Sequence, residues 1–154
     1  MIKVISITLC FLSLTFLKVI GQDFSIEYGK ITNEEVELKE YPLDKDAKAV
    51  VLFDKAQSYF VENGGSFDVV FERITRIKIL SEGGISWAEV EIPFYREGDI
   101  FEKVYDIEAS SYNYENGGLN RSKMNPSDAF DEKKNESWYL KKFAIPNVKI
   151  GSVV

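Results

Sequence analysis

Apolar and polar residues alternate along the middle of the chain, and this alternation predicts long β-strands. Residues 66–80 form the longest such stretch, in which Val70 and Ile74 interrupt the polar face and indicate a bulge or a change of sheet. The apolar face of this strand is expected to carry Phe67, Val69, Phe71, Thr75, Ile77 and Ile79. Glu62-Asn63-Gly64-Gly65 predicts a hairpin turn before it, because Asn and Gly accept the positive φ of tight turns.

Shorter strand patterns lie on both sides of this hairpin. Residues 87–92 alternate between apolar and mostly acidic positions and predict a strand that Pro93 ends. The charged segment 125–137 predicts a loop with a helical turn at 128–133. Further strands are expected at 49–53, 56–61, 100–114, 119–124, 138–145 and 148–154, with turns at 116–118 and 146–147.

Helical signals are short. Thr32-Asn33-Glu34-Glu35 matches a capping box, which predicts one or two helical turns that end before Pro42. Strands recur about every 10 to 15 residues with no long amphipathic helix between them. The pattern therefore predicts an all-β, mainly antiparallel fold, a β-sandwich-like domain with one or two short helical turns.

The two ends of the chain carry their own signals. Residues 1–21 have the charge and apolar run of a signal peptide, with cleavage expected after Gly21, so residues 22–154 form the β-sandwich-like domain. A retained short membrane anchor is the alternative. Residues 149–154 resemble the start of a strand, so we expect an N-terminal piece of a longer protein that is truncated in its last strand and prone to associate through that exposed edge.

The amino-acid composition limits the catalytic groups, metal ligands and partners that this chain can have. The chain has no histidine, and its single cysteine, Cys10, lies in the predicted signal peptide. Catalysis by Ser–His–Asp or Cys–His groups needs an imidazole, and zinc and copper prefer nitrogen and sulfur ligands, so we expect no enzyme activity, metal or cofactor in this chain. The net charge is −6, and it falls by two more units when Lys3 and Lys18 leave with the signal peptide. Nucleic acid and anionic lipid are therefore not expected partners, and no transmembrane span is expected after cleavage.

Two sets of side chains were candidates for a site. Glu89 and Glu91 lie at i and i+2 on one strand face, where a carboxylate pair for glycoside hydrolysis is conceivable but solubilising charge is the more ordinary reading. Exposed aromatic residues would form a stacking platform for a sugar or an extended peptide, although core packing is the commoner role. The aromatic candidates are Trp87, Tyr105, Tyr112, Tyr114 and Tyr139.

Four stretches in order resemble one family. They are residues 32–35 with Tyr41-Pro42 and Asp46-Ala47, then 49–52, then 76–80 with Gly83 or Gly84, and finally 143–146 with Val148 and 151–154. Together they resemble the bacterial domain of unknown function that precedes a transglutaminase-like domain in exported proteins. The resemblance implies a non-catalytic front part, with the catalytic Cys–His–Asp set on the following domain and no family catalytic residue in this chain.

These observations lead to two functional hypotheses. The first is an accessory domain of the periplasm or cell envelope that positions a transglutaminase-like partner domain or its peptide or glycan substrate, for example by strand addition. The second is an independent carbohydrate- or peptide-binding β-sandwich module. A purely structural spacer is a variant of the first that the sequence does not separate from it.

Overall fold

The computed structural model describes residues 28–154. The predicted signal peptide lies outside the described residues. Strands dominate, and all named strand pairs are antiparallel, which confirms the all-β, sandwich-like fold class. One short helix, α1 (Asn33–Glu37), and two 3-10 segments, η1 (Glu82–Ala88) and η2 (Pro126–Asp128), complete the regular structure described.

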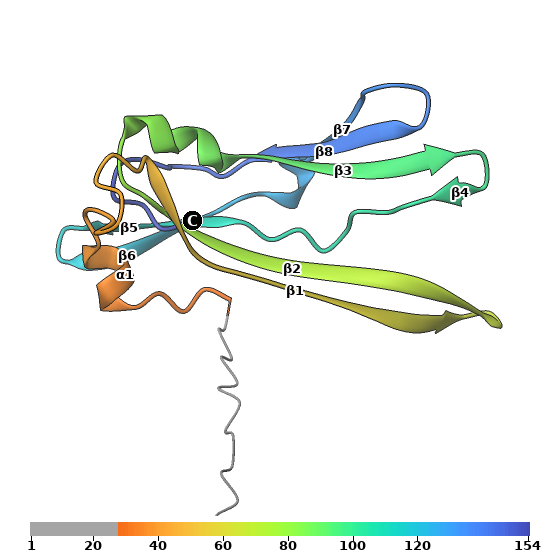
Figure 1. The fold of residues 1–154 in the computed structure, drawn as a ribbon, viewed down its shortest axis with the longest axis horizontal. Helices are drawn as coiled ribbons and strands as arrows, with labels where there is room; N and C mark the ends of the chain where they lie inside the picture. Colours follow the sequence, from red (N-terminus) through yellow and green to blue (C-terminus); the bar gives the residue numbers. More distant parts are fainter. Residues whose placement is uncertain (1–27) are drawn as a thin grey trace, which may run out of the picture.

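Two layers of strands make up the molecule (Figure 1). The first contains the long hairpin of β1 (Ala49–Asn63) and β2 (Ser66–Ile79) and the hairpin of β5 (Ser110–Glu115) and β6 (Gly118–Lys123). Val153 forms bridges to both Lys78 of β2 and Tyr112 of β5, and so joins the two hairpins. The second layer has the strand order β4-β3-β8-β7. Its strands are β3 (Glu89–Glu97), β4 (Ile100–Phe101), β7 (Phe130–Lys133) and β8 (Trp138–Ala144).

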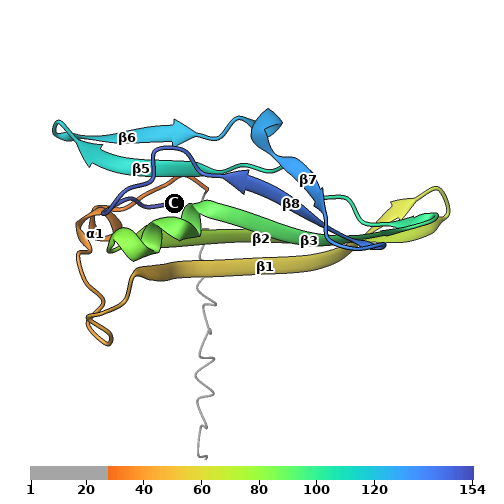
Figure 2. The same cartoon turned by 90° about the horizontal axis from the view of Figure 1, so that it is seen from above.

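The core lies where the two layers overlap. Buried Ala109, Met124 and Phe143 form its centre, and half-buried apolar side chains from β3 and the neighbouring loops pack against them. Ile79 and Val153 are fully buried nearby. In Figure 2 the tips of the β1–β2 and β3–β4 hairpins lie together at one end of the molecule.

The capping box and the hairpin turns follow the sequence signals. Thr32 N donates to Glu35 Oε2 at 2.8 Å, and Glu35 N donates back to Thr32 Oγ1 at 3.2 Å, which starts α1. Gly64 and Gly65 close the β1–β2 turn with φ values of 58° and 87°. Such values cost little only in the absence of a Cβ, so the predicted hairpin is confirmed.

The long hairpin differs from its prediction in two details. β1 is one continuous strand, because Asp54 and Lys55 face solvent as part of the ladder instead of ending it. The register shift lies on β1, between Val51 and Phe53, and not at Val70 or Ile74 of β2. Leu52 is thus the extra residue of a bulge that twists the hairpin where it leaves the body.

Pro93 does not end its strand, which was predicted to stop there. β3 starts after η1 and continues through Pro93 to Glu97. Tyr95, two residues further on, directs its carbonyl away from β8, where it accepts from the Glu102 N–H at 2.7 Å. Pro93 has the same orientation, so its missing N–H falls on the side of β3 that does not pair with β8.

Three other segments also depart from expectation. Residues 128–133 do not form a helical turn: β7 runs over Phe130–Lys133, where Asp131 bonds to Lys141 of the neighbouring strand β8. The stretch 100–114 is regular only in β4 and β5. Ser152–Val154 is the paired part of the last segment, and it lies between β2 and β5 instead of forming an exposed edge.

Candidate functional site

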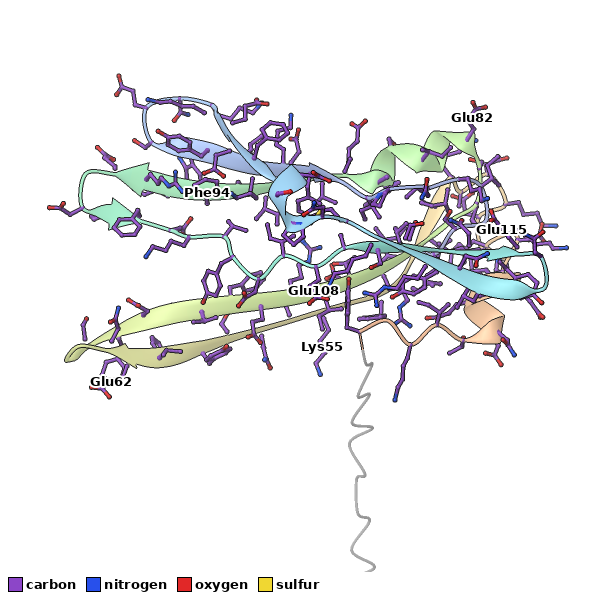
Figure 3. All side chains as sticks on the ribbon, turned by 180° about the vertical axis from the view of Figure 1, so that it is seen from behind. Lys55, Glu62, Glu82, Phe94, Glu108 and Glu115 are labelled. Atoms are coloured by element: carbon purple, nitrogen blue, oxygen red, sulfur yellow. The ribbon has the colours of Figure 1, made fainter. Side chains whose placement is uncertain are left out.

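The distal two thirds of the β1–β2 hairpin form the most unusual surface of the described chain. We call residues 54–63 and 66–75 the hairpin arm. β1 and β2 have 15 and 14 residues, about two to three times the common strand length of five or six. The arm lies beyond the buried core residues, and in Figure 1 it diverges from the β3–β4 hairpin, which reaches about as far in the same direction. In Figure 3, Glu62 marks the tip of the arm and Lys55 its proximal end, while Glu82 and Glu115 lie at the other end of the molecule.

One face of the arm is apolar and exposed. Phe67, Val69 and Phe71 of β2 have 68%, 67% and 64% of their surface exposed, and Phe60 of β1, opposite Val69, has 73%. We call these four residues the apolar stripe. The same face of β2 continues into Ile77 and Ile79, which are only 8% and 0% exposed. A row of large apolar side chains in water usually marks an interaction surface or an aggregation site.

The backbone of β2 is open along the same stretch. Ile77 exchanges hydrogen bonds of 2.8 Å with Val154, and Ile79 bonds to Gly151 and Ser152 at 2.9 Å. Every second residue of a strand directs its N–H and C=O to the same side, so Thr75, Arg73, Phe71, Val69 and Phe67 direct theirs to this side too. Among residues 28–154, no backbone group pairs with them there. We call this side of residues 67–75 the open edge.

The polar face of the arm is ordered by contacts across the hairpin. Glu72 accepts hydrogen bonds of 2.6 Å from both Tyr59 and Gln57. The hydrogen bonds from Tyr59 and Gln57, chiefly the one from Tyr59, lower the pKa of Glu72. The Tyr59–Glu72 bond also raises the pKa of Tyr59, to which Tyr105 adds a small effect. Nearer the tip, Asp68 accepts from Asn63 at 2.8 Å. Two carboxylates, four residues apart, therefore line one face of β2.

A bidentate ion pair braces the proximal end of the arm. Arg73 donates to Asp54 through Nε at 2.8 Å and through Nη2 at 2.5 Å, and Thr75 donates to the same carboxylate at 3.1 Å. The hydrogen bond from Arg73 is the main reason that the pKa of Asp54 is lowered. Beside it, a small hollow of about 130 Å³ lies between the segments Phe53–Gln57 and Glu72–Ile74. This hollow is too small for more than a side chain.

Buried charged groups fix the base of the hairpin to both chain segments that cover it. Lys78 is 1% exposed, and its Nζ donates to the carbonyls of Val36 and Gly151, each at 2.7 Å. Burial lowers the pKa of this amine. Arg76 pairs with Glu35 of the capping box at 2.7 Å, so α1 is held against β2 as well. The arm thus starts from a rigid base.

A second concave surface lies on the opposite end of the same layer. It is a polar hollow of about 430 Å³ bounded by Asn113, Glu115, Asn120, Ser122 and residues 147–149. Asn113 donates to the Asn147 carbonyl at 2.9 Å and accepts from Ser152 Oγ at 2.5 Å, while Asn147 Nδ2 donates to Ser122 at 2.9 Å. Most of its amide and hydroxyl groups are therefore used to hold the last segment against β5 and β6.

The structure does not bring the predicted candidates together. Glu91 forms an ion pair with Lys142 at 2.7 Å, which fits solubilising charge on the outer face of β3 and β8. The five aromatic candidates lie on η1, the loop before β5, β5 itself and β8; Tyr112 is buried, and Tyr139 stacks on Phe94 at 5.6 Å. Within residues 28–154, no ring contact joins any two of the five.

The sequence predicts that Phe67, Val69 and Phe71 share one face of their strand, but not that this face is exposed, so the apolar stripe is absent from the predicted site candidates. The stripe is exposed because the β1–β2 and β3–β4 hairpins diverge toward their tips, and no local signal in the sequence indicates this divergence.

Neither a metal site nor a membrane helix is evident in the part of the chain that the structure describes. Among these residues, no group of three or more Asp, Glu, His or Cys side chains is placed to hold a metal ion. Over the same residues, no helix has the length and apolar character needed to cross a bilayer. Comparison with protein-family models, with curated proteins and with solved structures found no match.

Proposed function

We propose that this chain is a non-catalytic, exported accessory domain that holds an extended polypeptide by strand addition on β2. The proposal rests on the coincidence of the open edge with the apolar stripe: Phe67, Val69 and Phe71, whose outward backbone groups have no partner among residues 28–154, also present exposed apolar side chains. Strand addition uses both features, since main-chain hydrogen bonds supply affinity and alternate side-chain contacts supply specificity.

The proposed setting is the cell envelope, next to a transglutaminase-like domain of the same protein. The family resemblance and the predicted signal peptide support this setting, and the absence of histidine from the chain supports a non-catalytic role. A domain of this kind would present a polypeptide to its neighbour while that neighbour performs the chemistry.

Amide turnover tests the non-catalytic role. The purified chain should neither cleave nor crosslink a glutamine-containing peptide, as followed by ammonia release and by mass spectrometry. A protein with the Glu89→Gln and Glu91→Gln substitutions serves as a control, because it should match the parent if those acids only solubilise the surface. Turnover by the isolated chain that survives repurification contradicts the proposal.

Carbohydrate binding is the second candidate, and the polar hollow at β5 and β6 favours it. Asn120 lines this hollow without a part in holding the last segment, its amide is of the type that bonds sugar hydroxyls, and the volume of about 430 Å³ lies in the range of small-molecule sites. Titration of the chain with a set of envelope glycans, compared with an Asn120→Ala variant, separates this candidate from peptide binding at the arm. Glycan binding that Asn120→Ala abolishes would support it.

A further inference from the structure

Two aromatic pairs lie on opposite faces of the sheet where β3 pairs with β8. Phe94 lies opposite Tyr139, and the next residue, Tyr95, lies opposite Trp138. Successive residues of a strand point to opposite faces, so one pair faces the first layer and the other faces outward. Phe94, labelled in Figure 3, is 1% exposed, whereas Trp138 is 47% exposed. The same two strands therefore carry one buried ring pair and one ring pair in contact with water.

The inner pair is completed by a cation of the chain itself. The rings of Phe94 and Tyr139 stack with their centroids 5.6 Å apart. The guanidinium of Arg96 lies 4.6 Å from the centroid of Phe94 and 5.3 Å from that of Tyr139. Asp131 pairs with Arg96 at 3.2 Å and also with Lys141. A guanidinium suits this position because its plane stacks on aromatic faces while its N–H groups pair with a carboxylate.

The outer pair has the rings and the carboxylate, but no cation from residues 28–154. Tyr95 and Trp138 meet edge to face, with their centroids 5.5 Å apart and their planes at 75°. Glu97 accepts hydrogen bonds from the Tyr95 hydroxyl and, at 3.2 Å, from Ser137 Oγ. Both bonds reach Oε2, so Oε1 of Glu97 keeps its lone pairs for a further donor. Within the described chain, no Lys or Arg lies over either ring or pairs with Glu97.

The charge around the outer pair favours a positive ligand. The neighbouring Lys134 and Lys142 both pair with Glu132, and Lys142 pairs with Glu91 as well. Glu97 thus keeps its negative charge beside the two rings, whose faces also attract cations. The net charge of −6 for the whole chain attracts cations at long range and disfavours an anionic ligand.

We infer that Tyr95, Trp138 and Glu97 form a binding site for a guanidinium group, of the kind that an arginine side chain carries. The guanidinium would lie against the exposed Trp138 ring and donate to Oε1 of Glu97, which is the combination of contacts that Arg96 makes on the inner face. This inference goes beyond the proposed function and does not rest on it. The site lies on the outer face of the second layer, whereas the open edge and the last segment belong to the first layer.

The two tryptophans of the chain provide an internal control for the test. Trp87, on η1, is 51% exposed, close to the value for Trp138, but within residues 28–154 it makes no ring contact. Nα-acetyl-arginine methylamide is titrated into the full chain, and the two indole N–H signals are followed by ¹H–¹⁵N NMR. The Trp138 signal should shift in a saturable way, and the Trp87 signal should not move.

Two analogues of this probe test which property of the ligand is recognised. The citrulline analogue has nearly the same shape but no charge, and it should bind at least about fivefold more weakly. The lysine analogue has the charge without the plane, and it should bind about threefold more weakly.

Matched variants assign the shift to this site. Glu97→Gln removes the charge and should weaken arginine binding about fivefold, whereas Glu89→Gln, on the same face of β3 but away from the rings, should leave it unchanged. Trp138→Leu should abolish saturable binding as read from the backbone amide of Tyr95, whereas Trp87→Leu should preserve it. Thermal unfolding of each variant checks that the fold is retained, and Glu97→Gln decides the case if Trp138→Leu does not fold.

The outcomes distinguish the source of the guanidinium from failure of the inference. Equal affinity for methylguanidinium and blocked arginine supports a site for free guanidinium compounds, and at least tenfold tighter binding of a Gly-Arg-Gly peptide supports a site for a polypeptide. Citrulline or lysine analogues that bind as tightly as the arginine probe overturn the inference. Equal shifts of the Trp87 and Trp138 signals also overturn it. Neither failure bears on strand addition at β2, because no residue of the arm takes part in this site.

Discussion

The two halves of the β1–β2 hairpin have the same backbone and opposite surroundings. At the base, Ile77 and Ile79 are buried, and charged groups on the other face bond to α1 and to the last segment. In the arm, the same two faces of β2 carry an exposed apolar stripe and a solvated row of carboxylates. β2 alternates in the same way in both parts; the difference is that other segments of the chain pack on the base and leave the arm exposed.

This comparison bears on how function relates to stability in this fold. The base contributes to folding because burial of its apolar side chains removes them from water. The arm gains little from its apolar residues in the isolated chain, so their presence there fits a contact made outside it. Substitutions in the two halves should therefore separate folding from binding.

The largest expected effect comes from shortening an apolar side chain in each half. Ile79→Ala should lower the free energy of unfolding by about 3 to 4 kcal/mol, since it removes buried methyl groups and leaves a cavity. Phe71→Ala should lower it by less than about 1 kcal/mol, because the ring is already in water. Urea unfolding followed by tryptophan fluorescence measures both. A loss for Phe71→Ala as large as that for Ile79→Ala would show that the arm is covered in solution.

The sequence predicts which side chains of β2 share a face, but not whether that face is buried. Alternation placed Phe67, Val69 and Phe71 on the face of Ile77 and Ile79, and the structure agrees. Whether that face is buried depends on whether the second layer packs against it, and in Figure 1 the β3–β4 hairpin diverges from the arm although it reaches about as far. The hairpin turn at Gly64-Gly65 was predictable because its φ values depend on local residue type alone.

The errors in β3, β7 and the last segment have a common cause. By sequence alone Pro93 predicts a strand end, but its effect depends on which neighbour its missing N–H would face. The charged stretch 128–133 was read as a helical turn, but Asp131 and Glu132 find Lys141 and Lys142 on the adjacent strand. The open edge itself was invisible for the same reason, since a strand's partners come from distant parts of the chain.

The buried amine at the base provides the next test of the comparison. Lys78→Met keeps most of the side-chain volume but removes both hydrogen bonds to the carbonyls of Val36 and Gly151, so unfolding should become easier by about 2 kcal/mol. Lys55→Met, on the exposed arm, is the control and should change stability by less than about 0.5 kcal/mol.

The pH dependence of the same variant adds a second readout. The pKa of Lys78 is lowered in the folded chain, so the unfolded state holds the proton to higher pH and the stability of the parent should rise as the pH approaches 10.5. Lys78→Met has no amine to titrate at this position, so the difference in the free energy of unfolding between parent and variant should widen as the pH approaches 10.5. A gap that narrows would mean that the ammonium is stabilised by its two carbonyl partners.

The smallest expected effect concerns the order of the arm's polar face. Glu72 owes its lowered pKa first to the hydrogen bond from Tyr59, so Tyr59→Phe should move that pKa back toward 4.5, as measured by carbon-detected NMR of the side-chain carboxyl. Stability should change little, because both groups are exposed. Tyr95→Phe, which removes a hydroxyl on the other hairpin, should leave the titration of Glu72 unchanged. If Tyr59→Phe also leaves it unchanged, the carboxylate of Glu72 is not held across the hairpin in solution, and a guest strand would meet a mobile charge instead of a fixed one.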